Sequence, residues 1–384
     1  MNITQKIKKY TYKLNRTNDP KKISVYNKKL KYYNRSSSNT TNIIYKQSGG
    51  VRIGYVGETK DGKEHGKGKL SISHGHYIET YDGEWKNGEK DGYGVHIDRY
   101  HIYKGYFKNG KRNGQGIYTH GSDRYEGEWK NGYRHGKGKS EGEYGTYDGD
   151  WEYDKKHGYG IYEGYGGYNF RYTGKFEYGK KHGQGVLLLL KYNWREQEYT
   201  GTEEKYNGEW KYGKRHGKGI GKIPTFSISD RKKKTVTYGD DIYDGEWEND
   251  TPHGYGTIKK YKYGVEKGKY SGEWRFGYRE GKGIETLPSY TVDDGNPTSI
   301  LYDGMWIDGK KNGEGVEIKY EYTYNGMWVN GWKHDNGIKI LKNGDKFNEM
   351  WIHGAMIFSN PIPPVEVISE PRKKLELLRE LEML

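Results

Sequence analysis

The histidines are the residues of this sequence whose spacing first suggests chemistry, because imidazoles at regular positions can bind a metal ion. Seven of the 13 occupy equivalent positions in a recurring pattern: His65, His135, His157, His182, His216, His253 and His334. Metal ligands must lie within about 2 Å of one ion, whereas equivalent residues on stacked β-hairpins are roughly 10 Å apart. We therefore expect no metal site, and interpret these histidines as structural groups near turns.

Two further patterns could support catalysis. The Gly-x-Gly pairs resemble phosphate-binding loops, but such loops join a strand to a helix, and here strand-like residues follow each pair. Carboxylates that precede the tryptophan positions are expected to face solvent: Glu84, Glu128, Asp150, Glu209, Glu246 and Glu273. With no cysteine and no carboxylates expected to converge in a cleft, we predict no catalytic residue and no cofactor. The protein is predicted not to be an enzyme.

One repeated pattern defines the elements that position these residues, and it reads Tyr-x-Gly-x-Trp-x-x-Gly-x-x-His-Gly-x-Gly. Its clearest copy contains Tyr125, Gly127, Trp129, Gly132, His135, Gly136 and Gly138. Eleven copies begin at Tyr55, Tyr81, Tyr103, Tyr125, Tyr147, Tyr172, Tyr206, Tyr243, Tyr270, Tyr302 and Tyr324, and a degenerate twelfth begins at Phe347. The base unit has 22 residues, with insertions of up to 15.

Each copy is predicted to form one β-hairpin. Tyr, Gly and Trp alternate with polar residues, which is typical of a strand with one buried face. Pairs such as Asn131-Gly132 then predict a two-residue turn in which both residues have positive φ. Glycines weaken the second strand unless something packs closely over its backbone, and we expect aromatic rings of the neighbouring hairpin to do so. The hairpins therefore bury their aromatic face by stacking.

The pattern resembles the MORN repeat (membrane occupation and recognition nexus). The copies cover about residues 55–340 and depart from the pattern at single positions, such as Thr59 for Trp and Asp154 or Asp250 for Gly. These departures suggest local loosening. The resemblance implies an all-β fold, an elongated open solenoid of about 11–12 stacked antiparallel β-hairpins. It also implies a scaffold with protein partners and proposed contact with phospholipid.

The charge divides the chain into three segments. Residues 1–48 contain 12 Lys and Arg and one acidic residue, Asp19, and therefore hold +11 of the total charge of +14. We predict a basic, flexible arm over 1–48, with a basic amphipathic helix over residues 3–14 as the alternative. The repeat array is predicted over 49–358. Residues 359–384 are predicted to be a Pro-rich linker and a short C-terminal α-helix, which either covers the last hairpin or forms a homodimer.

The arm is the predicted site of electrostatic binding. Its candidate residues for an anionic surface are Lys6, Lys8, Lys9, Lys13, Lys21, Lys22, Lys28, Lys29 and Lys31. Basic residues contribute about 1 kcal/mol each near anionic lipid, so we expect peripheral association with anionic phospholipid membranes. Nucleic-acid or other polyanion binding is the alternative, because the arm also carries tyrosines that could stack on bases.

Apolar segments bear on localisation. The longest aliphatic run, 186–190, is far shorter than the about 20 residues of a membrane-spanning helix, and the N-terminus lacks the apolar region of a secretory signal. We expect an intracellular protein, soluble or peripheral to a membrane. Insertions over 186–205, 220–242 and 284–301 either contact partners or are neutral loop expansions.

Overall fold

A computed structural model describes residues 3–14, 16–17, 19–35, 42–48, 51–165, 169–193, 198–228, 236–262, 264–291 and 297–363. The chain divides into two compact units, Met1–Gly213 and Lys214–Leu384. We call them the N-terminal and the C-terminal unit and describe each by itself. The predicted C-terminal helix and the basic residues 231–234 lie outside the described residues.

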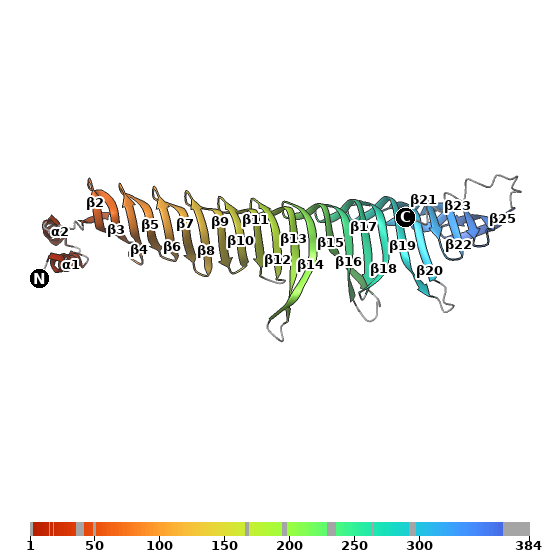
Figure 1. Ribbon diagram of the computed structural model, residues 1–384, viewed down its shortest axis with the longest axis horizontal. Helices are drawn as coiled ribbons and strands as arrows, with labels where there is room; N and C mark the ends of the chain where they lie inside the picture. The colour runs from red at the N-terminus through yellow and green to blue at the C-terminus, as the bar shows by residue number, and fades with distance from the viewer. Residues whose placement is uncertain are drawn as a thin grey trace. The chain divides into compact units, whose positions relative to one another are not determined.

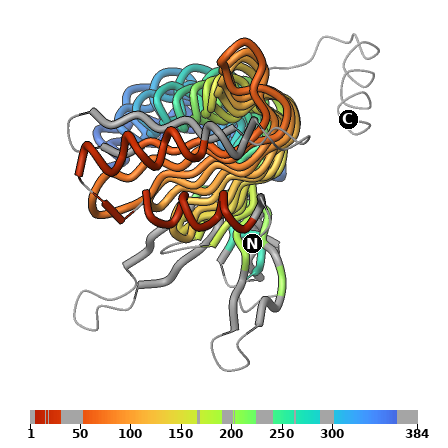
Figure 2. Tube along the Cα trace, turned by 90° about the vertical axis from the view of Figure 1, so that its left-hand side faces the viewer, coloured from red at the N-terminus to blue at the C-terminus, as the bar shows by residue number. Residues whose placement is uncertain are grey.

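The N-terminal unit begins with two helices and continues as strands (Figure 1). Its elements are α1 (Ile3–Leu14), α2 (Pro20–Arg35), β1 (Asn42–Ser48), β2 (Val51–Lys60), β3 (Lys63–Ser73), β4 (Ile78–Lys86), β5 (Glu89–Asp98), β6 (His101–Lys108), β7 (Lys111–His120), β8 (Asp123–Lys130), β9 (Tyr133–Gly142), β10 (Gly145–Glu152), β11 (Lys155–Gly164), β12 (Phe170–Glu177), β13 (Lys180–Asn193) and β14 (Glu198–Lys211). Each strand pairs antiparallel with its neighbours in the chain. Seen from the end of the stack, its successive hairpins lie one behind another, each offset slightly from the last (Figure 2).

The C-terminal unit repeats this organisation. It contains β15 (Lys214–Ile228), β16 (Val236–Glu248), β17 (Thr251–Lys262), β18 (Val265–Arg275), β19 (Tyr278–Thr291), β20 (Pro297–Ile307), β21 (Lys310–Ile318), β22 (Tyr322–Val329), β23 (Trp332–Leu341), β24 (Lys346–Ile352) and β25 (Ala355–Ile362). Pairing is again antiparallel between strands consecutive in the chain. The predicted all-β fold of stacked hairpins is confirmed, and the insertion over 220–242 extends the β15–β16 hairpin.

The first 35 residues differ from a simple flexible arm. α1 matches the amphipathic helix given as the alternative, and α2 was not predicted. α2 begins at Pro20 because the Asp19 carboxylate accepts a hydrogen bond from the Lys21 backbone N–H (2.9 Å), an N-cap followed by proline in the first turn. The two helices contact each other, with the Tyr10 and Tyr26 rings 6.1 Å apart, and Leu14 of α1 and Leu30 of α2 are buried. Figure 2 shows both helices at the N-terminal end of the chain.

The predicted turns are confirmed. Asn131 has a φ of 54° and Gly132 a φ of 94°, as a two-residue type I′ turn requires. Tyr153 (46°) and Asp154 (64°) adopt the same conformation without glycine. A β-bulge follows each turn, at Gly136 in this repeat (φ 57°), and shifts the register between Gly127 and Trp129.

Glycines form a row that crosses the strands. In the middle of the N-terminal unit, Gly127 pairs with Gly138, which pairs in turn with Gly149. A Cβ on Gly138 would overlap the ring and hydroxyl of Tyr125, and a Cβ on Gly127 would overlap the Gly138 backbone. The tyrosine that covers the second glycine thus belongs to the same hairpin, not to its neighbour as expected. Glycine is required here because the ring lies directly on the backbone.

Aromatic rings join each hairpin to the next. The Trp129 ring lies edge-on between Tyr125 of its own repeat and Tyr103 of the preceding repeat, with centroid distances of 5.2 and 5.3 Å. Trp129 Nε1 donates a hydrogen bond to the Gly116 carbonyl oxygen of the preceding hairpin (3.2 Å). The Tyr125 hydroxyl donates to the Glu128 carbonyl oxygen (2.9 Å). This alternation of Tyr and Trp or Phe forms the core of each unit.

The Tyr–Gly contact leads to a paired test. Replacing Gly138 by Ala should lower the free energy of unfolding by about 3 kcal/mol, the upper end of the range of about 1–3 kcal/mol for overpacking a filled site, because the new Cβ would overlap three side-chain atoms of Tyr125. Gly132→Ala is the matched control, because that position has positive φ but nothing within 4 Å of a Cβ, and should cost only about 1 kcal/mol of backbone strain. Urea unfolding followed by circular dichroism measures both variants. Equal destabilisation would contradict the contact.

Candidate functional site on the aromatic face

Basic residues cover the aromatic core, and sequence reasoning missed them. The residue that precedes the histidine position is Lys or Arg in nine repeats, and its charged group lies over aromatic rings. We call these nine the basic ladder: Lys90, Arg112, Arg134, Lys156, Lys181, Arg215, Arg279, Lys311 and Lys333. Three of the arginines stack on the tryptophan of the next repeat: Arg112 lies 4.1 Å from the Trp129 centroid, and Arg134 and Arg215 each lie 4.2 Å from those of Trp151 and Trp247.

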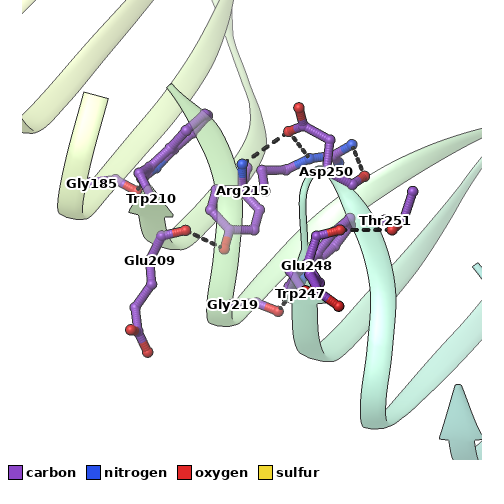
Figure 3. A network of polar contacts seen from close by, with 10 residues as sticks. Gly185, Glu209, Trp210, Arg215, Gly219, Trp247, Glu248, Asp250 and Thr251 are labelled. Atoms are coloured by element: carbon purple, nitrogen blue, oxygen red, sulfur yellow. Dashed lines mark hydrogen bonds and ion pairs between the residues drawn. The ribbon is translucent and has the colours of Figure 1, made fainter. Parts of the chain in front are cut away.

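The turn aspartates hold two of these arginines in place. Arg215 Nε and its backbone N–H both donate to the Asp250 carboxylate (3.2 and 2.9 Å), and Nη2 donates to the Asp250 carbonyl oxygen (2.8 Å) (Figure 3). Asp154 binds Arg134 in the same way. The interpretation that Asp154 and Asp250 loosen their repeats is therefore wrong, because each aspartate adds hydrogen bonds that a turn glycine lacks.

The carboxylates before the tryptophans are not merely solvated. Glu128 Oε1 accepts a hydrogen bond from the Lys137 backbone N–H (3.0 Å), the amide that follows the bulge glycine. Asp150 and Glu273 make the same bond, to Tyr159 (3.0 Å) and Lys282 (3.1 Å) respectively. These side chains supply a partner for an N–H that the bulge removes from the ladder of backbone bonds.

Removing this partner should be measurable. Glu128→Ala should lower the free energy of unfolding by about 1–2 kcal/mol, because a hydrogen bond to a charged acceptor is lost. Glu126→Ala on the same strand should change it by less than about 0.5 kcal/mol, because its partner Arg124 is exposed and such pairs contribute little. Thermal unfolding of the two variants shows whether Glu128 is a structural hydrogen-bond acceptor or a solvated surface charge. Equal destabilisation by the two substitutions would mean that Glu128, like Glu126, is only a solvated surface residue.

The repeated histidines lie beside the turns. His135 contacts the Tyr153 ring of the next turn (centroids 6.0 Å apart), and His182 Nδ1 lies 3.1 Å from the Glu177 carboxylate. Within the ranges that the structure describes, no group of three or more His, Asp or Glu is placed to hold a metal ion. The histidine positions are used to pack one turn against the next.

A cavity of about 470 Å³ opens on the aromatic face of the N-terminal unit. We call it the basic recess, and among its lining residues are Arg112, Tyr118, Arg134, Ser140, Lys156 and Tyr162. The Lys156 ammonium lies 3.3 Å from the Tyr162 ring centroid. Burial, assisted by the charge of Arg134, lowers the pKa of Lys156 from 10.5 to about 8. Burial likewise lowers the pKa of Arg112.

The predicted arm lysines are largely on the surface of the two helices. Lys8, Lys9, Lys13, Lys21, Lys22, Lys28 and Lys29 are exposed and Lys6 is half-buried. The side chain of Lys31 is outside the described part. Among the apolar residues of α1, Leu14 is buried and the Tyr10 ring lies 6.1 Å from that of Tyr26 in α2. No described helix is long and apolar enough to cross a membrane.

Comparison with known families agrees with the repeat boundaries. The family model described as MORN repeat matches eleven segments that together cover more than half of the chain. They are residues 55–75, 81–98, 103–122, 125–142, 147–167, 172–189, 206–220, 243–265, 270–292, 302–320 and 324–346. Each segment starts at a tyrosine predicted to begin a repeat. Comparison with curated proteins gives no match.

Proposed function

Because this chain belongs to the MORN-repeat family, we propose that it is a non-catalytic scaffold whose basic N-terminal arm adsorbs to anionic membranes. MORN repeats are generally interaction modules, and the stacked hairpins offer a regular surface to protein partners. Charge supports the finer proposal, since +11 of the net +14 lies within residues 1–48. The single observation that carries it is the exposure of seven lysines on α1 and α2.

The packing of the helices defines how the arm would bind. An amphipathic helix inserts into a bilayer through an unoccupied apolar face, but on α1 Leu14 is buried and the Tyr10 ring contacts Tyr26 of α2. Binding would therefore be electrostatic and sensitive to salt. Seven exposed lysines at about 1 kcal/mol each correspond to an affinity no tighter than roughly micromolar.

Nucleic-acid binding is the competing proposal for the same lysines. It requires aromatic rings available to stack on bases. Of the arm tyrosines whose side chains the structure describes, Tyr10 and Tyr26 pack on each other, and Tyr12 is exposed. One accessible ring gives less support for base stacking than seven exposed lysines give for an anionic surface.

Vesicle co-sedimentation tests the membrane proposal. The full chain should bind phosphatidylserine-containing vesicles and not phosphatidylcholine vesicles. Replacing Lys8, Lys9 and Lys13 by Gln should weaken binding about a hundredfold, since three charges contribute roughly 3 kcal/mol. Replacing the exposed strand lysines Lys86, Lys108 and Lys130 by Gln is the control, and should have little effect.

Two outcomes would overturn the proposal. One is the absence of binding to anionic vesicles at low salt. The other is equal weakening of vesicle binding by the arm and strand substitutions. That result would mean that binding depends on the net charge of the protein and not on the arm. Binding to a single-stranded oligonucleotide that exceeds binding to anionic vesicles, and is lost in the arm variant, would favour the competing proposal.

A further inference from the structure

Three of the four ladder cations in the C-terminal unit are paired with carboxylates of the aromatic face: Arg279, Lys311 and Lys333. The fourth, Arg215, is held by the turn residue Asp250. Arg279 Nη1 lies 2.7 Å from the Glu285 carboxylate, and Lys311 Nζ lies 4.0 Å from that of Glu317. Glu285 and Glu317 each follow their cation by six residues on the same strand. Glu317 is 6% exposed, so this carboxylate is held within the aromatic face beside the charge that it neutralises.

In the N-terminal unit the same position holds no carboxylate. Six residues after Arg112, Arg134 and Lys156 come Tyr118, Ser140 and Tyr162 respectively, and these six residues all line the basic recess. Over the described ranges, Arg112 and Lys156 form no ion pair. Arg134 binds Asp154, but that aspartate is an exposed turn residue.

Half-buried cations without a counter-charge are costly, because the charged form is desolvated. The three cations lie on alternate strands, β7, β9 and β11, so their backbones are spaced roughly 10 Å apart. They repel one another, and the charge of Arg134 adds to the effect of burial on the pKa values of both neighbours. A carboxylate that enters the recess would offset the desolvation of these cations and reduce the repulsion between them. Glu285 and Glu317 provide such a counter-charge in the other unit.

We propose that the basic recess binds an acidic segment of a protein partner, whose carboxylates take the place that Glu285 and Glu317 occupy in the C-terminal unit. The roughly 10 Å spacing of the cations matches every third residue of a polyproline II chain, which rises about 3.1 Å per residue and turns once in three residues, so that every third side chain lies on the same face. Tyr118 and Tyr162 offer rings for the residues between. This inference concerns the repeats alone and does not rest on membrane adsorption by the arm.

The surroundings of the recess favour a peptide over a dense polyanion. Its lining also includes four carboxylates. Asp123, Glu143 and Asp154 are exposed, and Glu141 is half-buried and lies 2.9 Å from the Lys139 ammonium. These carboxylates would repel the continuous phosphates of a nucleic acid or the surface of an anionic bilayer. A short segment with spaced carboxylates reaches the half-buried cations while its neutral residues pass the exposed acids.

Fluorescence anisotropy of the full chain tests the inference. The probe is a fluorescein-labelled peptide with Glu at every third position and Ser or Tyr elsewhere, and the control probe has Gln for each Glu. The acidic peptide should bind, and the combined Arg112→Gln and Lys156→Gln variant should weaken its binding at least about tenfold. Lys311→Gln is the matched control, because it changes the same repeat position where Glu317 already provides the counter-charge, and should leave binding unchanged.

A second variant separates lost binding from lost folding. Ser140→Glu would place a carboxylate in the recess at the position of Glu285, an arrangement that the C-terminal unit already accommodates. It should abolish peptide binding while the circular dichroism spectrum and melting temperature stay at wild-type values. Equal binding by wild type and Ser140→Glu would overturn the inference, as would equal losses in the recess and Lys311 variants.

The arm variant distinguishes the two proposals. If the acidic peptide binds the recess, replacing Lys8, Lys9 and Lys13 should leave peptide affinity unchanged at physiological salt, whatever the vesicles show. Peptide binding lost in the arm variant and retained in the recess variant would contradict the inference. Preference of the recess for an oligonucleotide or anionic vesicles over the peptide would contradict it equally.

Discussion

The contact between a tyrosine ring and a glycine backbone is the constraint on which the rest of this structure depends. In every repeat for which the structure describes the contact, the tyrosine lies over the second strand of its own hairpin, where a Cβ on Gly138 or its equivalents would overlap the ring. The hydroxyl then reaches a backbone carbonyl three residues along, as Tyr125 does at Glu128. Once this ring is placed, the tryptophan has one remaining space, between its own tyrosine and that of the preceding repeat. Hairpin and stack are thereby specified by the same few residues.

Because these few Tyr, Gly and Trp positions specify the hairpin and the stack, other positions of the repeat can vary. Insertions lengthen the hairpins β13–β14, β15–β16 and β19–β20 without altering the Tyr–Gly contact, because they lie beyond it along the strands. The basic ladder lies above the core. Six residues after Lys311 stands the carboxylate that neutralises it, Glu317, whereas six residues after Lys156 stands Tyr162, whose ring the ammonium covers. In the last matched repeat the Tyr–Gly contact is kept, because a Cβ on Gly337 would overlap Tyr324. The Tyr324 hydroxyl, however, has no hydrogen-bond partner within the described residues, and Asp335 replaces the bulge glycine.

Much of this fold could be predicted from the sequence, because alternation, turn pairs and glycines report on backbone geometry directly. Tyr125, Gly127 and Trp129 predicted a face, and Asn131-Gly132 predicted a turn. What was missed depends on contacts between repeats. Arg134 resembles any surface arginine until Trp151 of the next hairpin is placed beneath it, although a basic residue in nine repeats at one position was a visible signal. α2 was missed because its lysine-rich composition resembles a disordered tail, and its Asp19-Pro20 start was overlooked.

Alkaline titration of the tyrosines tests the central role of the buried ring most directly. Burial raises the pKa of the repeat tyrosines above the ordinary value of 10.0, to about 12 for Tyr55 and Tyr324 and higher for their neighbours. A raised pKa means that their stabilisation is complete below pH 10 and is lost as the pH rises through the folded value. Phenolate absorbance should therefore show exposed tyrosines ionising near their ordinary pKa with the β-sheet circular dichroism intact. The remaining tyrosines should ionise only at higher pH, together with loss of that signal. Ionisation of all tyrosines near pH 10 with the sheet retained would contradict this account.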